Sequence, residues 1–442
     1  MTNVFMALRT PPGAFARRPY LGGIMGVDDE QLVPFPQEVR DLHDLARERE
    51  IAQRALPFPA EEYAERLRRL RAALTEAGID TLLLSRPESI CWLTGYAARW
   101  YRHSGPAEWA GLITVAVRTD GDAIHHFDFA GEEDMIALTS VCTDVCILPE
   151  SARTLEAFVD ELRARGMVRG VVGREMRSCL PDHLTATVLE EAMRTEGAAV
   201  VDATGLVDRL LHIKSPAEIA RVEEAVRICD LGVRAAQRAV APGVTELEVW
   251  AEMMRAMVAA GGEPAALHEM VAAGPLFLPH IISRRRPIAL GDLVMVDPCG
   301  VVDRYHGNVA RTIVAGEPTD EQLAASRTAG ALMAVFAAAV RPPAPLADVA
   351  ATVRSRLKEA GLWESRYFFG GYDLGIAFPP DWVGAWYFDL DDTRPDKAFE
   401  PGMVTNLEAV AGAFAHVDTV VYDAGRARLL STVPREILAA GA

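Results

Sequence analysis

The chain has 442 residues, of which 50% are hydrophobic and 24% are charged. This length and balance exclude a disordered or collagen-like protein and predict a globular protein of two domains. Acidic residues (62) outnumber basic ones (45), so the net charge is −17. That charge argues against nucleic acid as a partner, but it allows a small anionic substrate held by local arginines.

Six cysteines are scattered along the chain without the paired spacing of a zinc site, which predicts thiols in a reducing cytoplasm. Residues 1–23 lack a long apolar core and carry arginines and prolines, so they are a poor signal peptide. The longest apolar run, residues 328–340, is too short to span a bilayer and indicates a buried helix. We therefore expect a cytoplasmic protein that binds no membrane.

The first half of the chain alternates helical and strand patterns. Residues 1–55 form an extension with a charged helical stretch, and a helix over 61–77 is expected to end at Gly78. A buried strand over 79–85 follows, and two more strands join at a turn formed by Asp120 and Gly121. Further helices and strands alternate as far as residue 203. This order predicts a compact α/β domain over residues 56–211.

The pattern changes near residue 212, where two long helices begin. The first has Ser215 as its N-cap and Glu218 at the third helical position, and Thr245 caps the second. Strands follow, then two helices over 319–340 and 346–360, and then strands again. Two similar helix-helix-strand halves predict an α+β domain with pseudo-twofold symmetry over residues 212–442.

Three segments of this second domain carry a family resemblance. They are GDLVMVD (291–297), ARTIVAGE (310–317) and EPGMVTNLE (400–408), in that order. Together they resemble the pita-bread superfamily, which includes methionine aminopeptidase, prolidase, aminopeptidase P, creatinase and ectoine hydrolase. The resemblance covers about residues 60–436. It implies a pita-bread fold, a creatinase/prolidase-type N-terminal domain, and a homodimer.

The metal-dependent members of this superfamily bind two metal ions through Asp, Asp, His, Glu and Glu. The matching positions here hold, in that order, Asp297, Asn308, Tyr372, Glu408 and Val417. Only two of the five can serve as carboxylate ligands, and two carboxylates are too few for a dinuclear site. A shifted alignment at Asp418 would restore one ligand but neither the histidine nor the second aspartate. We therefore predict no metal and no cofactor.

Creatinase shows that this superfamily also supports catalysis without metal. The resemblance places its histidine at His280, 17 residues before Asp297, where a neutral imidazole can act as a general base. Glu408 can bind a guanidinium or amidinium group through paired hydrogen bonds. Ala310 stands where creatinase has a second carboxylate and His306 where it has a tyrosine, so creatine itself is a doubtful substrate. The stretch GYDLGIAFPPDW (371–382) resembles members of the ectoine-hydrolase type.

The predicted catalytic residues are His280 and Glu408. The predicted substrate-binding residues are Asp297, His306, Asn308, Tyr372, Arg99, Trp100 and Tyr101. The last three are included because the resemblance implies that their segment reaches into the partner subunit's site. Several of these have a structural alternative: His306 is equally compatible with the core, and Asp297 or Tyr372 could belong to turns. One arginine of 284–286 could face the pocket, although such a run usually lies on the surface.

The sequence thus favours metal-independent hydrolysis of a non-peptide C–N bond in a small guanidino, amidino or cyclic amidine carboxylate. A metal-dependent Xaa-Pro peptidase and a catalytically inactive binding protein remain as alternatives. A metal-dependent lyase is disfavoured by the same missing ligands.

Overall fold

The computed structural model describes residues 37–53, 56–97, 110–274, 282–359, 361, 363–391, 396–411 and 414–441. Its contacts divide the chain into two compact units, with the division between Leu210 and Leu211. Within the described ranges, no helix is both long enough and apolar enough to cross a membrane.

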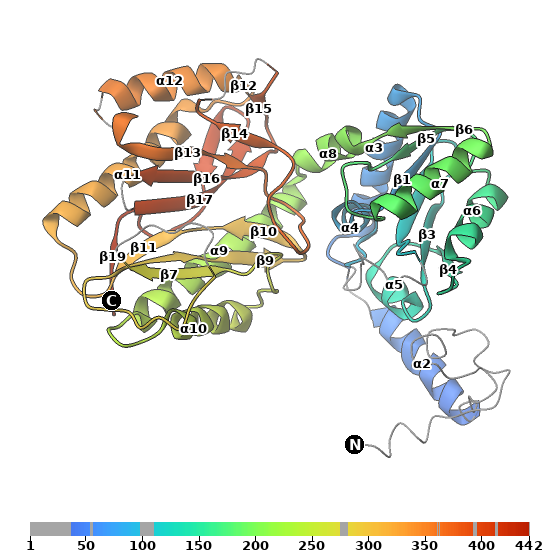
Figure 1. Ribbon diagram of the computed structural model, residues 1–442, viewed down its shortest axis with the longest axis horizontal. Coiled ribbons are helices and arrows are strands. Elements are labelled where there is room, and N and C mark those ends of the chain that lie inside the picture. The colour runs from blue at the N-terminus through green and yellow to red at the C-terminus, as the bar shows by residue number, and fades with distance from the viewer. Residues whose placement is uncertain are drawn as a thin grey trace. The chain divides into compact units, whose positions relative to one another are not determined.

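The first unit is a six-stranded sheet in the order β4-β3-β2-β1-β5-β6, with helices on both faces (Figure 1). The central strand β1 is buried at all four positions, as expected for a continuous apolar run. The strands are β1 Thr81–Leu84, β2 Thr114–Arg118, β3 Ile124–Phe129, β4 Asp144–Leu148, β5 Gly170–Arg174 and β6 Ala198–Asp202. The helices are α2 Gln37–Gln53, α3 Ala60–Ala77, α4 Pro87–Thr94, α5 Glu133–Thr139, α6 Thr154–Ala164, α7 His183–Thr195 and α8 Thr204–His212.

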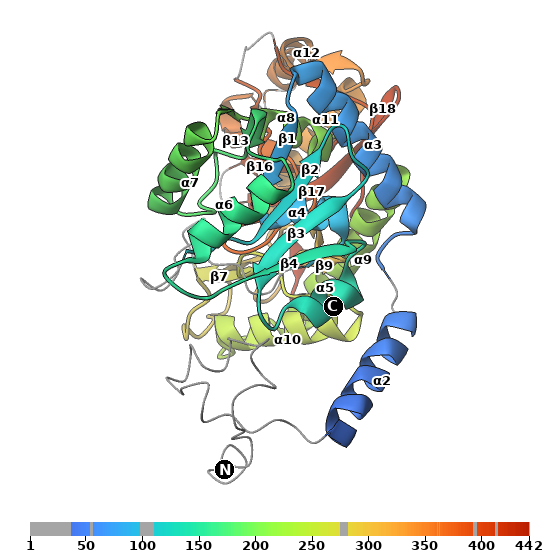
Figure 2. The same ribbon diagram turned by 90° about the vertical axis from the view of Figure 1, so that its right-hand side faces the viewer.

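The helices of this unit cover the sheet as an α/β domain requires. Figures 1 and 2 show α6 and α7 on one face, and α3 and α4 on the other. Phe127 of β3 packs edge to face on Phe158 of α6, with ring centroids 5.0 Å apart. Helix α3 ends at Gly78, whose φ of 66° is the left-handed conformation of a helix C-cap, as predicted.

The sequence analysis did not predict three short helices of this unit, α4, α5 and α8. Helix α4 has eight residues, and all but Glu88 are buried, so it shows no polar face and no helical periodicity. Strand β4 begins at Asp144, so it contains Cys146, and Cys142 precedes it.

The second unit contains two sheets, each accompanied by a pair of helices. In Figure 1, α10 and α12 lie on opposite outer sides with both sheets between them. One sheet has the order β19-β11-β8-β7 and the other β14-β13-β16-β17-β18, while β9 pairs with β10, and β12 with β15, as separate two-stranded ribbons. The helices are α9 Pro216–Ala239, α10 Glu246–Ala259, α11 Asp320–Ala339 and α12 Leu346–Glu359.

In chain order, one group of strands comes after α9 and α10, and a second group comes after α11 and α12, except that β12 lies between α11 and α12. They are β7 Met270–Gly274, β8 Leu293–Asp297, β9 Cys299–Val302, β10 Tyr305–Asn308, β11 Arg311–Val314, β12 Ala344–Pro345, β13 Arg366–Tyr372, β14 Tyr387–Asp389, β15 Ala398–Phe399, β16 Val404–Ala411, β17 Phe414–Asp423, β18 Arg426–Leu429 and β19 Leu438–Ala439. The sequence analysis missed β13. A bridge between Ala310 and Val417 joins the two sheets. The two helix-helix-strand halves form the predicted pseudo-symmetric α+β domain.

Local sequence signals set the helix starts of this unit. Ser215 and Glu218 form a reciprocal capping box on α9, and Thr245 and Glu248 form another on α10, so both predicted N-caps are confirmed. Helix α9 then packs directly against the β9–β10 ribbon. A Cβ atom on Gly300 would lie 2.1 Å from the Ala225 carbonyl oxygen, so only glycine permits this contact.

Candidate functional site

The two carboxylates expected in the site come from different sheets. Asp297 ends β8, and Glu408 lies in the middle of β16. Asn308, at the end of β10, donates from Nδ2 to Asp297 Oδ1 at 2.8 Å and to the Pro298 carbonyl at 3.3 Å. The structure therefore brings Asp297 and Asn308 together as the resemblance implied.

Asn406 connects this pair to Glu408. Its Nδ2 donates to Glu408 Oε1 at 2.8 Å and lies 3.4 Å from Asn308 Oδ1. Its own Oδ1 accepts the backbone N–H of Tyr372 at 2.8 Å. Asn406 is fully buried and Asn308 is 1% exposed. Sequence reasoning missed Asn406, although its position two residues before Glu408 on one strand places both on the same face.

Asp297 lies in an acidic environment. Burial, together with the charges of Glu408 and Glu269, raises the pKa of its carboxyl group to about 7, against the lowering effect of the Asn308 hydrogen bond. Glu269 precedes β7, is 4% exposed, and its Oε1 has no hydrogen-bond partner among the described residues. Burial also raises the pKa of Glu269. No motif or spacing in the sequence pointed to Glu269.

Tyr372 occupies the position of the family's histidine, at the end of β13. The indole Nε1 of Trp382 donates to its hydroxyl oxygen at 3.1 Å. Burial raises the pKa of Tyr372 well above its ordinary range, and the charges of Glu408 and Asp297 add to the shift. The phenol therefore stays neutral near pH 7 and can donate its proton in a hydrogen bond to another group.

His306 lies apart from this chemistry. The imidazole is fully buried, its Nε2 accepts the backbone N–H of Ala266 at 3.1 Å, and its Nδ1 donates to the Arg304 carbonyl at 2.8 Å. Burial lowers its pKa to about 3. With both ring nitrogens held by the backbone, the geometry favours the core alternative over a pocket wall.

The arginines of 284–286 are engaged elsewhere or exposed. Arg284 donates twice to Glu246, at 2.7 and 3.0 Å, and Arg286 pairs with Asp292 at 2.7 Å. The remaining predicted residues, His280, Arg99, Trp100 and Tyr101, lie outside the described residues.

The shifted alignment at Asp418 fails on geometry. Its Oδ2 accepts from Arg311 at 3.1 Å and from Arg435 at 2.8 Å, and its Oδ1 accepts the Ser431 backbone N–H at 2.9 Å. The Asp418 side chain is fully buried and stands next along the strand from Val417, hence on the opposite face. This carboxylate belongs to the core network.

Two family models match successive parts of the chain. The Creatinase/Prolidase N-terminal domain matches residues 66–210, and metallopeptidase family M24 matches residues 220–432. The protein is a member of the pita-bread superfamily. Solved structures share this superfamily's fold: an Xaa-Pro dipeptidase from Bacillus anthracis has a TM-score of 0.69 at 23% identity, covering 85% of this chain and 99% of its own.

Curated relatives of this pita-bread protein are hydrolases of more than one kind. The ectoine hydrolase of Halomonas elongata is 28% identical over 380 residues, covering 79% of this chain and 89% of that protein. A probable dipeptidase, PepE, of Mycobacterium tuberculosis is also 28% identical over 323 residues, covering 72% and 81%. These relatives support a hydrolase, and their names point to different substrates.

The dinuclear metal centre that the fold family implies does not fit this donor set. Asn308 and Asn406 direct N–H groups at the carboxylates that a metal would need, and Tyr372 is a neutral phenol. Among the described residues, no group of three or more His, Cys, Asp or Glu side chains is arranged to hold a metal ion.

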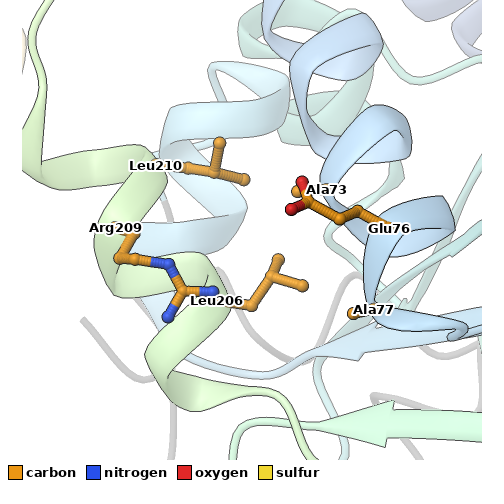
Figure 3. Close-up of a pocket in the computed structure, with 6 residues that line it drawn as sticks. All are labelled: Ala73, Glu76, Ala77, Leu206, Arg209 and Leu210. Carbon is orange, nitrogen blue, oxygen red and sulfur yellow. The ribbon is translucent and has the colours of Figure 1, made fainter.

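The first unit contains a separate open hollow of about 360 Å³ between α3 and α8 (Figure 3). Glu76 and Arg209 are its charged lining residues, and the others are apolar. None of the predicted site residues lines it.

Proposed function

We propose that this protein hydrolyses a non-peptide C–N bond in a small guanidino, amidino or cyclic amidine carboxylate, without a metal ion. The observation that carries the proposal is the pair of carboxylates, Asp297 and Glu408, each hydrogen-bonded to an asparagine amide where metallopeptidases hold metal. Two partly buried carboxylates in one site favour a cationic ligand. The ectoine hydrolase relative supports the same class of reaction.

In this proposal, Asp297 and Glu408 orient the cationic group of the substrate. His280 takes a proton from water, the water oxygen bonds to the amidine or guanidine carbon, and the C–N bond breaks as the leaving nitrogen takes up that proton. A neutral imidazole suits this role near pH 7. The two other histidines described in the core of this unit, His306 and His416, have pKa values lowered by burial to about 3, which makes them weak bases.

Tyr372 suits a supporting role as a neutral donor. Because Trp382 donates to the phenol oxygen, the phenol proton is left for another acceptor, such as a substrate carboxylate. Asn308 lines the same site. Arg99, Trp100 and Tyr101 are proposed to complete the site from the partner of a homodimer, on the family resemblance alone.

The test is a panel of guanidino and cyclic amidine carboxylic acids, ectoine included, each beside a neutral urea or lactam analogue. Ligand binding is read as thermal stabilisation, and turnover as appearance of the new amino group, which leaves an acyclic substrate and stays on the opened product of a cyclic amidine. We expect stabilisation by at least one cationic compound, none by its neutral analogue, and turnover that survives EDTA. Cleavage of Xaa-Pro dipeptides only after addition of Mn²⁺ or Co²⁺ would instead identify a peptidase. Binding without turnover of any compound would favour an inactive binding protein.

A further inference from the structure

The two buried asparagines form a chain of hydrogen bonds with a fixed direction. The backbone N–H of Tyr372 can only donate, so the atom of Asn406 that faces it at 2.8 Å must be the carbonyl oxygen. The Asn406 amide nitrogen therefore faces Glu408 and Asn308. Likewise, the Pro298 carbonyl can only accept, which orients the Asn308 amide nitrogen toward it and toward Asp297.

This fixed direction opposes metal binding in a specific way. An asparagine coordinates a metal through its carbonyl oxygen, and the amide nitrogen is not a ligand. If the Asn406 amide rotated by 180° so that its oxygen lay beside Glu408, its NH₂ group would face the Tyr372 N–H. Both groups are donors, so the hydrogen bond between them would be lost. Because Asn406 is fully buried, no water would compensate for the lost bond.

We propose that Asn406 and Asn308 take the place of metal ions: their amide groups hold Glu408 and Asp297 in position and keep divalent metals out. Asn406 is a positioning residue that acts through Glu408. The choice of an organic cation as the ligand rests on the proposed function, whereas the exclusion of metal does not. A change from amide to carboxylate at these positions should open the site to a metal.

The test uses the full-length variants Asn308→Asp and Asn406→Asp. Each keeps an oxygen acceptor and replaces the N–H donor by a second oxygen. Gln237→Glu is the matched control, because the Gln237 amide likewise donates to an oxygen, the Ala439 carbonyl at 2.9 Å, outside the cluster. Thermal unfolding is followed with and without about 1 mM MnCl₂, where a site of micromolar affinity gives a rise of roughly 3 °C or more.

We expect Asn308→Asp, alone or combined with Asn406→Asp, to gain this Mn²⁺-dependent rise. The wild type and Gln237→Glu should not respond. Mn²⁺ electron paramagnetic resonance gives a second readout, which also reports on a variant that unfolds too early for a thermal scan. Two outcomes would overturn the inference: tight Mn²⁺ binding by the wild type, or wild-type behaviour in both aspartate variants.

Acetamidine, a simple amidinium probe, separates this inference from the proposed function. Stabilisation of the wild type by acetamidine supports the organic-cation ligand. If acetamidine has no effect while the aspartate variants gain Mn²⁺ binding, the amide inference stands and the proposed substrate class is wrong.

Discussion

Glu408 and Val417 are direct cross-strand partners in the β16–β17 ladder. Direct partners of an antiparallel pair project on the same face, so the valine methyl groups lie beside the Glu408 carboxylate. The resemblance places the second glutamate ligand of the metallopeptidases at this position. An apolar side chain there leaves Glu408 without the companion carboxylate that would bridge two metals.

The purified protein should contain less than one transition-metal ion per chain. Asn308, Tyr372 and Val417 occupy three of the five ligand positions, and two carboxylates compete poorly with water for a metal. Elemental analysis of protein purified without chelator is the measurement. Two tightly bound metal ions per chain would end the metal-free proposal.

Asp297→Asn should stabilise the protein more at pH 8 than at pH 5. The pKa of Asp297 is raised from its ordinary value to about 7, so the native state holds a proton that the unfolded chain releases. The stability contributed by the protonated form is therefore present at acid pH and is lost as pH rises from about 4 to 7. Because an asparagine does not ionise, the variant avoids that loss. Its effect on the free energy of unfolding should therefore differ by on the order of 2 kcal/mol between pH 5 and pH 8.

Denaturant titrations at the two pH values measure this difference. Asp292→Asn is a useful contrast, because hydrogen bonds and the charge of Arg286 lower the pKa of Asp292 despite its burial. It should lose stability at pH 8. Equal effects of Asp297→Asn at both pH values would show that Asp297 titrates normally.

His306→Ala should lower stability and leave the KM of a substrate unchanged. The variant strands the Ala266 N–H and the Arg304 carbonyl, two buried groups that His306 now satisfies, which costs about 1–3 kcal/mol for each. Thermal unfolding and steady-state kinetics on one preparation measure both quantities. A raised KM in a stable variant would return His306 to the substrate pocket.

His280→Ala should reduce turnover by at least about a hundredfold, since a general base contributes roughly 10²–10⁴ in rate. Substrate binding and folding should be nearly unchanged. His183→Ala, at an exposed position on α7, is the control and should retain full turnover. Near-normal turnover in His280→Ala would show that His280 is not the general base and would contradict the proposed mechanism.

Trp100 is predicted to act in the partner subunit's site. If so, Trp100→Ala and His280→Ala subunits should complement each other, because one site of each mixed dimer would carry neither change. Co-refolding equal amounts of the two variants should then recover about a quarter of wild-type activity, given random pairing. A monomer with full activity, or variants that never complement, would refute this prediction.

The sequence by itself determined the elements that depend on local signals. Capping boxes at Ser215 and Thr245 and the C-cap at Gly78 act within a few residues, so helix boundaries follow from the printed chain. Strand positions and motif order likewise located Asp297 and Glu408. Helix α4 was missed because tertiary burial of both its faces removes the periodicity that sequence analysis requires.

Only the tertiary structure decided what the site residues do. His306 and Asn308 lie two residues apart on one short strand, yet the first bonds the backbone in the core and the second bonds Asp297. The orientation of the Asn406 amide is set by its hydrogen bond from the backbone N–H of Tyr372, 34 positions away in sequence. That orientation points the amide nitrogen at Glu408. Hydrogen bonds between strands so distant in the chain depend on how the sheet folds, and no local pattern encodes them.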